Sequence, residues 1–581
     1  MDIIKKLNYI LDKKQKINIC VLGVMIFIGG ILETLSISAM LPVVWVIIDP
    51  DTLQRNKYCA KIIELLNVDN MQQFTIMLLL VLMVMYILKN AFLLLLTSEQ
   101  NRFISFNRNK LISQVLREFL NRPYEFYLDA DIPTVFRLTD SDIPNVFNIL
   151  LALISMASEA LVFVLICITL VMINWKLVLF LIVIFGMITL IMFKVLKPKL
   201  SMLGANNLKL QSRIAKWRIQ AIYGIKDVKV LHREAFFADN YESNGKKGAD
   251  LSRKYAVINA TPRLLIETFF MVAILGYLAV CVSRGEDMKQ MIPALTAFGV
   301  AAMRLMPCIN RINTYMTDIS YFKPCLDYVY ENMNINELSK KTNQTLLPVD
   351  ESKTMKLQNK IELKNIVYAY PNTENLIFNH ADMQIPYGKS VGIMGPSGAG
   401  KSTIVDILLG LLKVHEGQIL CDGVNVFDNY PAWLSQIGYI PQSIYLVDEP
   451  IRNNIAFGIA DEEIDEARIW QVLEEAQLAD FIKTLPEQLD TAIGDRGVRL
   501  SGGQRQRLGI ARALYHNPEI LVFDEATSAL DNETEAAVME AINSFHGKKT
   551  MVIIAHRLNT IEKCDVIYRV ENGKITQTTL S

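Results

Sequence analysis

The chain has 581 residues, of which 51% are hydrophobic and only 20% are charged, and its mean hydropathy is +0.26. This length exceeds what one compact core can hold, and this composition excludes an ordinary soluble enzyme. The 59 basic and 59 acidic residues balance, which gives no reason to expect a nucleic-acid partner.

Six apolar windows in the first part of the chain predict membrane-spanning helices. A helix that crosses the bilayer core needs about 20 mostly apolar residues. The windows are residues 17–48, 74–97, 146–173, 177–196, 264–282 and 291–315. We therefore expect residues 1–331 to form an α-helical transmembrane domain with six long helices.

The distribution of basic residues predicts how these spans are oriented. Five lysines precede the first span, and the long connection over residues 197–263 is rich in lysine and arginine. Basic residues close to a span mark its cytoplasmic side. We expect a multi-pass protein of the cell inner (plasma) membrane, with the N-terminus and everything after the sixth span in the cytoplasm.

The connections between the spans carry further predictions. Residues 98–143 and 197–262 are too long for simple loops and predict helical extensions of the spans. Each extension has a break, near residues 122–127 and 219–224, that indicates a small transverse helix or an ordinary turn. The external residues 51–70 have apolar residues at partly helical spacing, which indicates an interfacial helix.

Residues 332–360 contain few large apolar side chains and predict a linker to a second domain. From residue 361 to residue 581 the composition is that of a soluble, mixed α/β domain, with charged helices and short Val/Ile strands. The eight cysteines are scattered without metal-ligand spacing, which favours packed or incidental thiols.

A glycine-rich loop lies between an apolar strand and an amphipathic helix of this second domain. The pattern G-x-x-x-x-G-K-[ST] at Gly395, Gly400, Lys401 and Ser402 predicts a P-loop that binds ATP. Its backbone N–H groups surround the β-phosphate, Lys401 spans the β- and γ-phosphates, and Ser402 ligates Mg²⁺. The remaining phosphate-binding residues are Ser397, Gly398, Ala399 and Thr403.

An apolar strand over residues 520–523 ends in two carboxylates, Asp524 and Glu525. A lone acidic pair at a strand end is usually a solvated surface feature. Next to a P-loop, the first carboxylate suits Mg²⁺ and the second can polarise the attacking water as a general base. We therefore expect ATP and Mg²⁺ as cofactors.

Leu500-Ser501-Gly502-Gly503-Gln504 matches the LSGGQ signature of ATP-binding cassette proteins, and the resemblance covers residues 361–581. It implies that Tyr370 stacks on adenine, that Gln442 is the Q-loop residue serving catalysis and the metal, and that His556 is the switch histidine. It also implies that Asp531 is the D-loop residue. Asp495 stands in the exporter X-loop, where Glu is commoner.

Six spans before one cassette resemble a half-transporter of the ABC exporter type. In this family Ser501, Gly502 and Gly503 face the ATP that is held by a second cassette, so the resemblance implies a homodimer; a heterodimer with a related half-transporter stays open. The resemblance implies ATP hydrolysis coupled to transport. The alternative of an ATP-gated channel or regulatory membrane ATPase is disfavoured by the intact Glu525, and the six spans exclude a soluble DNA-repair ATPase.

Charged residues inside the spans are the candidates for substrate contact, because each is costly when it faces lipid. They are Glu33, Lys89, Glu159, Arg304 and Arg311. Internal ion pairs, such as Glu33 with Arg304 or Lys89, are the alternative interpretation.

Residues 31–42 and 302–307 resemble the corresponding spans of bacterial flippases for lipid-linked oligosaccharides. This resemblance implies a lipid-linked oligosaccharide or a related glycolipid as the substrate, with membrane lipid as a partner. Export of peptides, lipids or drugs on the same scaffold is the alternative.

Overall fold

The computed structural model describes residues 2–38, 71–129, 132–283, 288–342, 355–371, 373, 375–494, 497–525, 532–555 and 558–579. The chain forms two compact units. The first comprises Met1–Arg122 and Asp131–Thr342, and the second comprises Pro123–Ala130 and Asn343–Ser581. The polypeptide therefore passes between the units at three points, after Arg122, after Ala130 and after Thr342.

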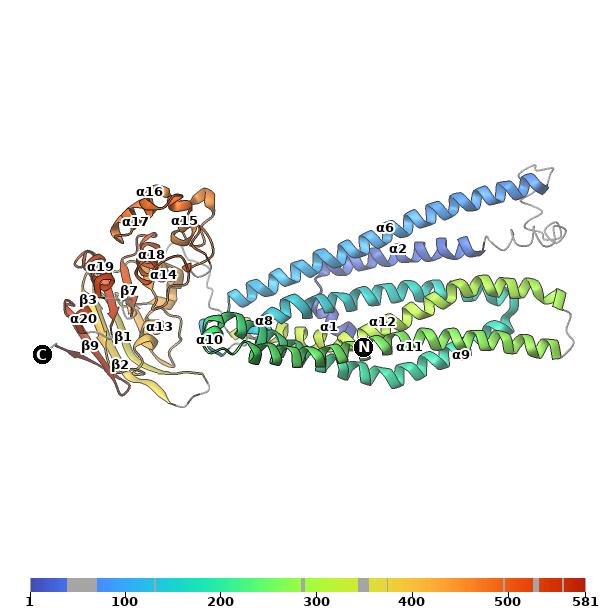
Figure 1. Ribbon diagram of the computed structural model, residues 1–581, viewed down its shortest axis with the longest axis horizontal. Helices are drawn as coiled ribbons and strands as arrows, with labels where there is room; N and C mark the ends of the chain where they lie inside the picture. The colour runs from blue at the N-terminus through green and yellow to red at the C-terminus, as the bar shows by residue number, and fades with distance from the viewer. Residues whose placement is uncertain are drawn as a thin grey trace. The chain divides into compact units, whose positions relative to one another are not determined.

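The first unit is built from helices, long ones connected by short ones, as its apolar composition predicts (Figure 1). They are α1 (Asp2–Ile10), α2 (Lys13–Ser38), α6 (Met71–Leu120), α8 (Ile132–Arg137), the π-helix η1 (Leu138–Asp142), α9 (Ile143–Tyr223), α10 (Ile225–Val230), α11 (Glu234–Ser283) and α12 (Met288–Thr342). Where side chains are described, three helical segments are long and apolar enough to cross a membrane: Lys13–Ser36, Ile76–Leu120 and Pro133–Ile168. These segments contain most of the first three predicted spans. Much of the other three falls on side chains outside the described residues.

Helices α2 and α6 form an antiparallel pair. The Gln15 side-chain amide donates a hydrogen bond of 2.8 Å to Asn107, and a Cβ atom added to Gly29 would lie 3.4 Å from the side chain of Leu93. Residue numbers therefore rise along α2 as they fall along α6. The same register places Glu33 on α2 level with Lys89 on α6.

Helix α9 reverses direction within its length. A straight helix rises about 1.5 Å per residue, so residues 142 and 212 would lie about 100 Å apart; yet Arg137, just before α9, donates a hydrogen bond to Ser212. The ribbon of α9 runs out and returns (Figure 1). Spans three and four were predicted with a connection over residues 174–176. The structure contains this hairpin, but its backbone stays helical through the connection.

Short helices lie at the two predicted transverse breaks. Helix α7 (Tyr124–Asp129) is in the predicted place and belongs to the second unit. Helix α10 starts directly after the predicted residues 219–224, of which 219–223 still belong to α9. Helix α12 continues to Thr342, so the segment predicted as linker from residue 332 begins as helix. The predicted interfacial helix at residues 51–70 lies outside the described residues.

The second unit contains two β-sheets. An antiparallel sheet has the order β2 (Leu376–Pro386), β1 (Lys360–Ala369), β4 (Glu416–Cys421) and β5 (Val424–Asn425). A six-stranded sheet has the order β10 (Lys574–Thr578), β9 (Val566–Glu571), β3 (Ser390–Met394), β8 (Thr550–Ile554), β7 (Ile520–Asp524) and β6 (Ile437–Ile440). All its pairings are parallel except β9 with β10.

Helices accompany these sheets, and together they form the predicted mixed α/β domain. The α-helices are α13 (Lys401–Leu408), α14 (Tyr430–Ser435), α15 (Ile451–Ile455), α16 (Glu466–Glu475), α17 (Ala479–Thr484), α18 (Gly502–Leu514), α19 (Asn532–Asn543) and α20 (Leu558–Ile561). Central strands β7 and β8 are fully buried, which explains their continuous apolar sequence. Because β3 and β7 both run parallel to β8, their carboxyl ends meet at one edge of the sheet.

Candidate nucleotide site

The loop between β3 and α13 wraps around the side chain of Lys401. Gly398 and Gly400 have φ angles of +79° and +100°, a region that residues with a side chain rarely adopt. Lys401 is only 5% exposed, and its Nζ donates hydrogen bonds of 3.1 Å to the carbonyl oxygens of Gly395 and Pro396. The loop thus holds its ammonium group at the start of α13, where a helix N-terminus favours a phosphate.

Asp524 lies at the carboxyl end of β7 and is suited to a hard cation. It is 8% exposed, and its Oδ1 atom has no hydrogen-bond partner among the described residues. Burial, and then the charge of Glu525, raises the pKa of Asp524, whereas a hydrogen bond from Ser402 lowers it. A cation such as Mg²⁺ would relieve both the burial and the repulsion, so Asp524 and Ser402 fit the predicted metal role.

Mg²⁺ usually takes only a few protein ligands and keeps waters and phosphate oxygens as the others. Among the described residues, no group of three or more His, Cys, Asp or Glu side chains is arranged to hold a metal ion.

Glu525 follows Asp524 in an unusual backbone conformation. Its φ angle is +50°, and its N–H donates a hydrogen bond of 3.2 Å to the carbonyl of Ile554 on β8. The Gln442 amide donates a hydrogen bond of 2.6 Å to the Glu525 carboxylate. Left-handed backbone at a non-glycine residue is concentrated at functional sites. The structure thus brings the predicted Q-loop residue to the predicted general base.

Tyr370 lies beside the P-loop. Its hydroxyl group is within 2.9 Å of the Thr403 hydroxyl, and its ring makes an edge-to-face contact with Tyr368 at 5.4 Å between centroids. Its predicted contact with adenine stays a prediction.

Ser501 and Gln504 close the start of α18 by a mutual capping arrangement. The Gln504 N–H donates to the Ser501 hydroxyl at 3.3 Å, and the Ser501 N–H donates to the Gln504 side chain at 2.8 Å. The sequence-based prediction did not include this role, although S-x-x-Q before a helix indicates it. Ser501 and Gly502 are exposed. The predicted site residues Asp531 and His556, together with Asp495, lie outside the described residues.

One acidic residue near the site was also missed. Asp406 lies on α13, and burial, followed by the charge of Asp524, raises its pKa to about 6. Its charge also acts on Tyr124 of α7, Tyr368 of β1 and Tyr439 of β6. Nothing in the sequence distinguishes Asp406 from a solvated helix residue, because its neighbours come from four separate segments.

We expect Asp406→Asn to raise the melting temperature of the full chain at pH 7.5. A raised pKa means that the folded state loses stability as pH rises from the unfolded pKa, near 4, to about 6, and stays penalised above it. Allowing for solvent screening, the gain is about 1–2 kcal/mol, or about 3 °C, falling to about half at pH 5. Thermal unfolding at pH 7.5 and pH 5 measures the change in melting temperature, and Asp428→Asn at an exposed position is the control. An equal gain at the two pH values would count against a raised pKa of Asp406.

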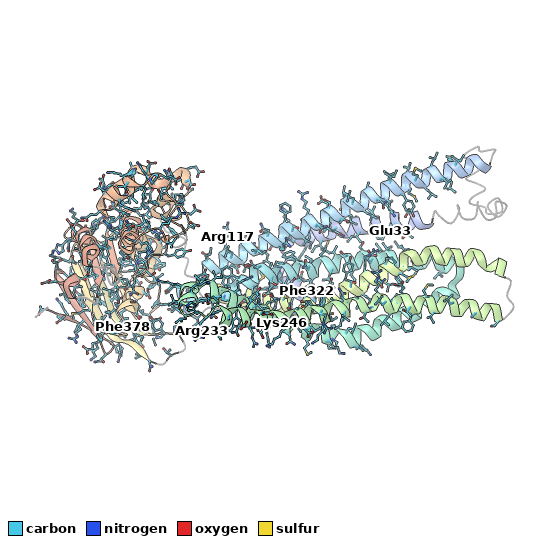
Figure 2. All side chains as sticks on the ribbon, viewed as in Figure 1. Glu33, Arg117, Arg233, Lys246, Phe322 and Phe378 are labelled. Atoms are coloured by element: carbon cyan, nitrogen blue, oxygen red, sulfur yellow. The ribbon has the colours of Figure 1, made fainter. Side chains whose placement is uncertain are left out.

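The structure shows Arg311 in an ion pair, and it shows Glu33 and Lys89 as buried side chains. Arg311 pairs with Glu159, with 2.6 Å between Nε and Oε1 and a hydrogen bond of 3.0 Å from Nη2 to Oε2. Glu33, near the C-terminal end of α2 (Figure 2), is 6% exposed, and Lys89 is 9% exposed. Among the described side chains, Glu33 and Lys89 do not form the alternative ion pair with each other. The side chain of Arg304 lies outside the described residues.

Known proteins resemble this chain along most of its length. The ABC transporter model matches residues 378–528, and the ABC transporter transmembrane region model matches residues 56–298. The ATP-dependent lipid A-core flippase of Cupriavidus metallidurans is 30% identical over 471 residues, which cover 81% of this chain and 78% of the relative. The protein of the same name from Haemophilus ducreyi is 44% identical over 218 residues, 37% of each chain.

A solved structure agrees in fold. A bacterial Atm1-family ABC exporter with ATP bound matches with a TM-score of 0.75 over 98% of this chain and 96% of that one, at 22% identity. At that identity the likeness bears on the fold alone, and it extends over both units.

Proposed function

Because this chain belongs to the ABC transporter family, we propose that two copies of it use ATP to flip a lipid-linked oligosaccharide or a related glycolipid across the membrane. The chain is a multi-pass membrane protein and an ATP-driven exporter of the half-transporter type, in which ATP hydrolysis is coupled to transport. The substrate class, the homodimer, the plasma membrane and the cytoplasmic cassette are the proposed parts.

Lys89 is the residue on which the proposed substrate class depends. The Lys89 side chain is 9% exposed, and its ammonium group lies 4.5 Å from the centroid of the Tyr86 ring. None of the ion pairs between described residues of the membrane helices includes Lys89. A buried charge inside the membrane is expensive unless it is paired or serves a ligand. An anionic group such as the pyrophosphate of a lipid-linked glycan would supply the missing charge.

The comparison with relatives is a second argument for a glycolipid as the substrate. The match to the Cupriavidus metallidurans protein, which is named a lipid A-core flippase, spans 78% of that relative and so reaches beyond the cassette into the membrane helices. Membrane helices of an exporter surround its substrate, so a likeness there supports a related substrate class. Arg311 is the weaker candidate contact because Glu159 already neutralises it.

The start of α18 supports the homodimer. A helix N-terminus leaves backbone N–H groups without intrahelical partners. Here Gly502 begins α18, Ser501 and Gly502 are exposed, and the capping box holds them in place. Such a terminus suits the γ-phosphate of an ATP bound to the P-loop of a second copy. Nanodisc-embedded protein should therefore be dimeric by mass photometry; a monomer that hydrolyses ATP at the full rate would exclude this assembly.

The residues of the site then have separate tasks. Lys401 and the loop amides hold the phosphates, Tyr370 contacts adenine, and Ser402, Asp524 and Gln442 would hold Mg²⁺. The metal neutralises phosphate charge when it is bound. Gln442 orients the Glu525 carboxylate through their hydrogen bond, and Glu525 accepts the proton of the attacking water, with His556 proposed to contact the γ-phosphate.

We expect Lys89→Gln to reduce flipping about tenfold while basal ATP hydrolysis stays within about twofold of wild type, since a lost charge contact costs about 1.4 kcal/mol or more. The assay follows a fluorescent polyprenyl-pyrophosphate-linked oligosaccharide in proteoliposomes with ATP. Lys89→Arg should restore transport because it keeps the charge.

Lys110→Gln is the matched control, because Lys110 lies on the same helix in an exposed ion pair with Asp12. Equal flipping by Lys89→Gln and wild type would remove Lys89 from the substrate site. No ATP-dependent flipping of the glycan probe by wild type, with activity on a peptide or drug instead, would replace the glycolipid proposal with the alternative exporter.

A further inference from the structure

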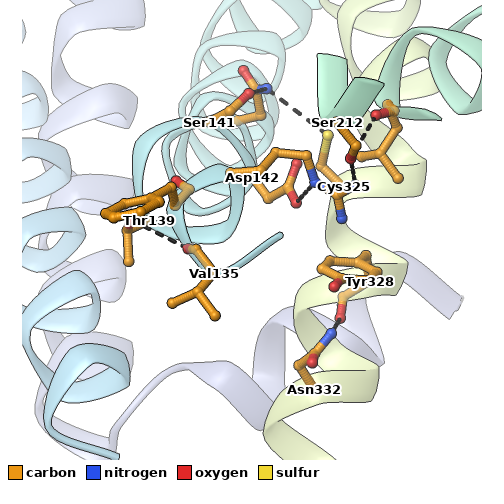
Figure 3. Close-up of polar contacts among 12 residues, drawn as sticks. Val135, Thr139, Ser141, Asp142, Ser212, Cys325, Tyr328 and Asn332 are labelled. Atoms are coloured by element: carbon orange, nitrogen blue, oxygen red, sulfur yellow. Dashed lines mark hydrogen bonds and ion pairs between the residues drawn. The ribbon is translucent and has the colours of Figure 1, made fainter. Parts of the chain in front are cut away.

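A polar cluster around a buried ion pair joins four elements of the first, helical unit. We call it the Arg137 clasp; it consists of Arg137 and the three residues that it contacts, Asp142, Ser212 and Tyr328. Figure 3 labels these three contact residues. Arg137 is the last residue of α8, Asp142 is the last residue of η1, Ser212 lies on the returning arm of α9, and Tyr328 lies on α12.

The guanidinium of Arg137 contacts every other member. Its Nε lies 2.9 Å from Asp142 Oδ2, and the two side chains are 9% and 1% exposed. Nη1 donates to the Ser212 hydroxyl, and the guanidinium carbon lies 4.4 Å from the centroid of the Tyr328 ring. One side chain therefore binds three elements, with its charge neutralised by a single carboxylate.

The backbone at the clasp is irregular. Residues Leu138–Asp142 form a π-helix between two α-helical segments, a feature that is rare and frequently found at functional sites. One turn later, the Asn145 amide contacts the Cys325 sulfur of α12 at 3.8 Å, so α9 and α12 are held together beside the clasp. The ion pair joins Arg137, which directly precedes the π-helix, to Asp142, its last residue.

The place of the clasp in the chain gives it a role. The second unit, which contains the cassette, is here called the cassette unit. The polypeptide leaves it after Ala130, directly ahead of α8, and Arg137 ends that helix. It enters the cassette unit again after Thr342, at the end of α12. The clasp thus ties together two of the segments that connect the helical unit to the cassette unit.

We propose that Arg137 is a positioning residue for transport, which passes movement of the cassette unit to α9 and α12 by binding both to α8. Movement that enters through α7 and α8 reaches Arg137 before it reaches the long helices. With the clasp intact, α9 and α12 follow α8; without it, the cassettes still bind and hydrolyse ATP, but the helices no longer respond fully. This role goes beyond the proposed function and does not depend on which substrate is carried.

Hydrogen exchange on the full chain in nanodiscs tests this role without any substrate. In wild type, ATP with vanadate should change exchange both in the P-loop, residues 395–404, and in α12, residues 323–332. In Arg137→Gln the P-loop response should persist, while the α12 response falls about fivefold, within the range that coupling residues show. Arg137→Lys, which keeps the charge, should recover part of it.

Arg253→Gln is the matched control, because Arg253 forms an exposed pair with Asp250 in the same unit, at 2.8 Å. A wild-type response of α12 in Arg137→Gln would overturn the proposal. If that variant does not fold, Asp142→Asn, which keeps the side-chain shape and one acceptor oxygen but removes the negative charge, decides by the same readout. Because ATP hydrolysis and exchange are measured without the glycan, failure of the glycolipid proposal remains distinguishable.

Discussion

Glu525→Gln should bind ATP within about twofold of wild type yet hydrolyse it about 100- to 10,000-fold more slowly, the range that loss of a general base produces. The amide is nearly the same shape as the carboxylate, and its oxygen can still accept the hydrogen bond from Gln442 that the carboxylate accepts at 2.6 Å. What is lost is the ability to take a proton from water. Phosphate release and binding of a fluorescent ATP analogue measure the two properties separately.

Glu562→Gln is a suitable control, because Glu562 is an exposed carboxylate of the same domain. We expect it to leave both properties unchanged. Hydrolysis by Glu525→Gln at the wild-type rate would show that another group activates the water. A loss of ATP binding in the same variant would point instead to a structural role for Glu525, whose left-handed backbone depends on its contact with β8.

The cassette could be predicted closely because its chemistry is local in sequence. Residues 395–403 carry the whole phosphate loop, and the strand–loop–helix pattern around them is the one that the structure contains. The contact between Gln442 and Glu525 joins residues far apart in the chain. The resemblance to a family assigned Gln442 to the site, but no sequence pattern predicted this contact. Asp406 shows the limit: its raised pKa arises from burial and from Asp524, which no local pattern encodes.

The membrane half was predictable in outline but not in its contacts. Hydropathy locates spans because lipid demands apolar surface along a whole helix. Hydropathy does not say which helices face each other. The ion pair between Arg311 and Glu159 was therefore missed. Glu33 and Lys89 were considered as a pair, but their described side chains do not form one. The Arg137 clasp depends on the reversal of α9, which brings Ser212 back to Arg137. Such contacts follow from the arrangement of helices and not from any one segment.

Gly395, at the start of the phosphate loop, lies so close to the backbone of β9 that it leaves no room for a side chain. A Cβ atom at Gly395 would lie 2.4 Å from the backbone carbonyl oxygen of Val570. Val570 is fully buried in β9, between β3 and β10, so this carbonyl cannot move without disturbing the central sheet. Gly395→Ala should therefore displace the loop and weaken ATP binding at least about tenfold, equivalent to about 1.4 kcal/mol.

Gly388→Ala separates this clash from the ordinary strain of replacing a glycine. Gly388 has a φ angle of +68°, but a Cβ atom there would meet nothing within 4 Å. That substitution should cost about 1 kcal/mol of stability through its backbone conformation while ATP affinity stays within about twofold of wild type. Titration of both variants with a fluorescent ATP analogue distinguishes the two causes. Equal affinities would mean that the loop tolerates a side chain at Gly395 and that β9 does not fix its position.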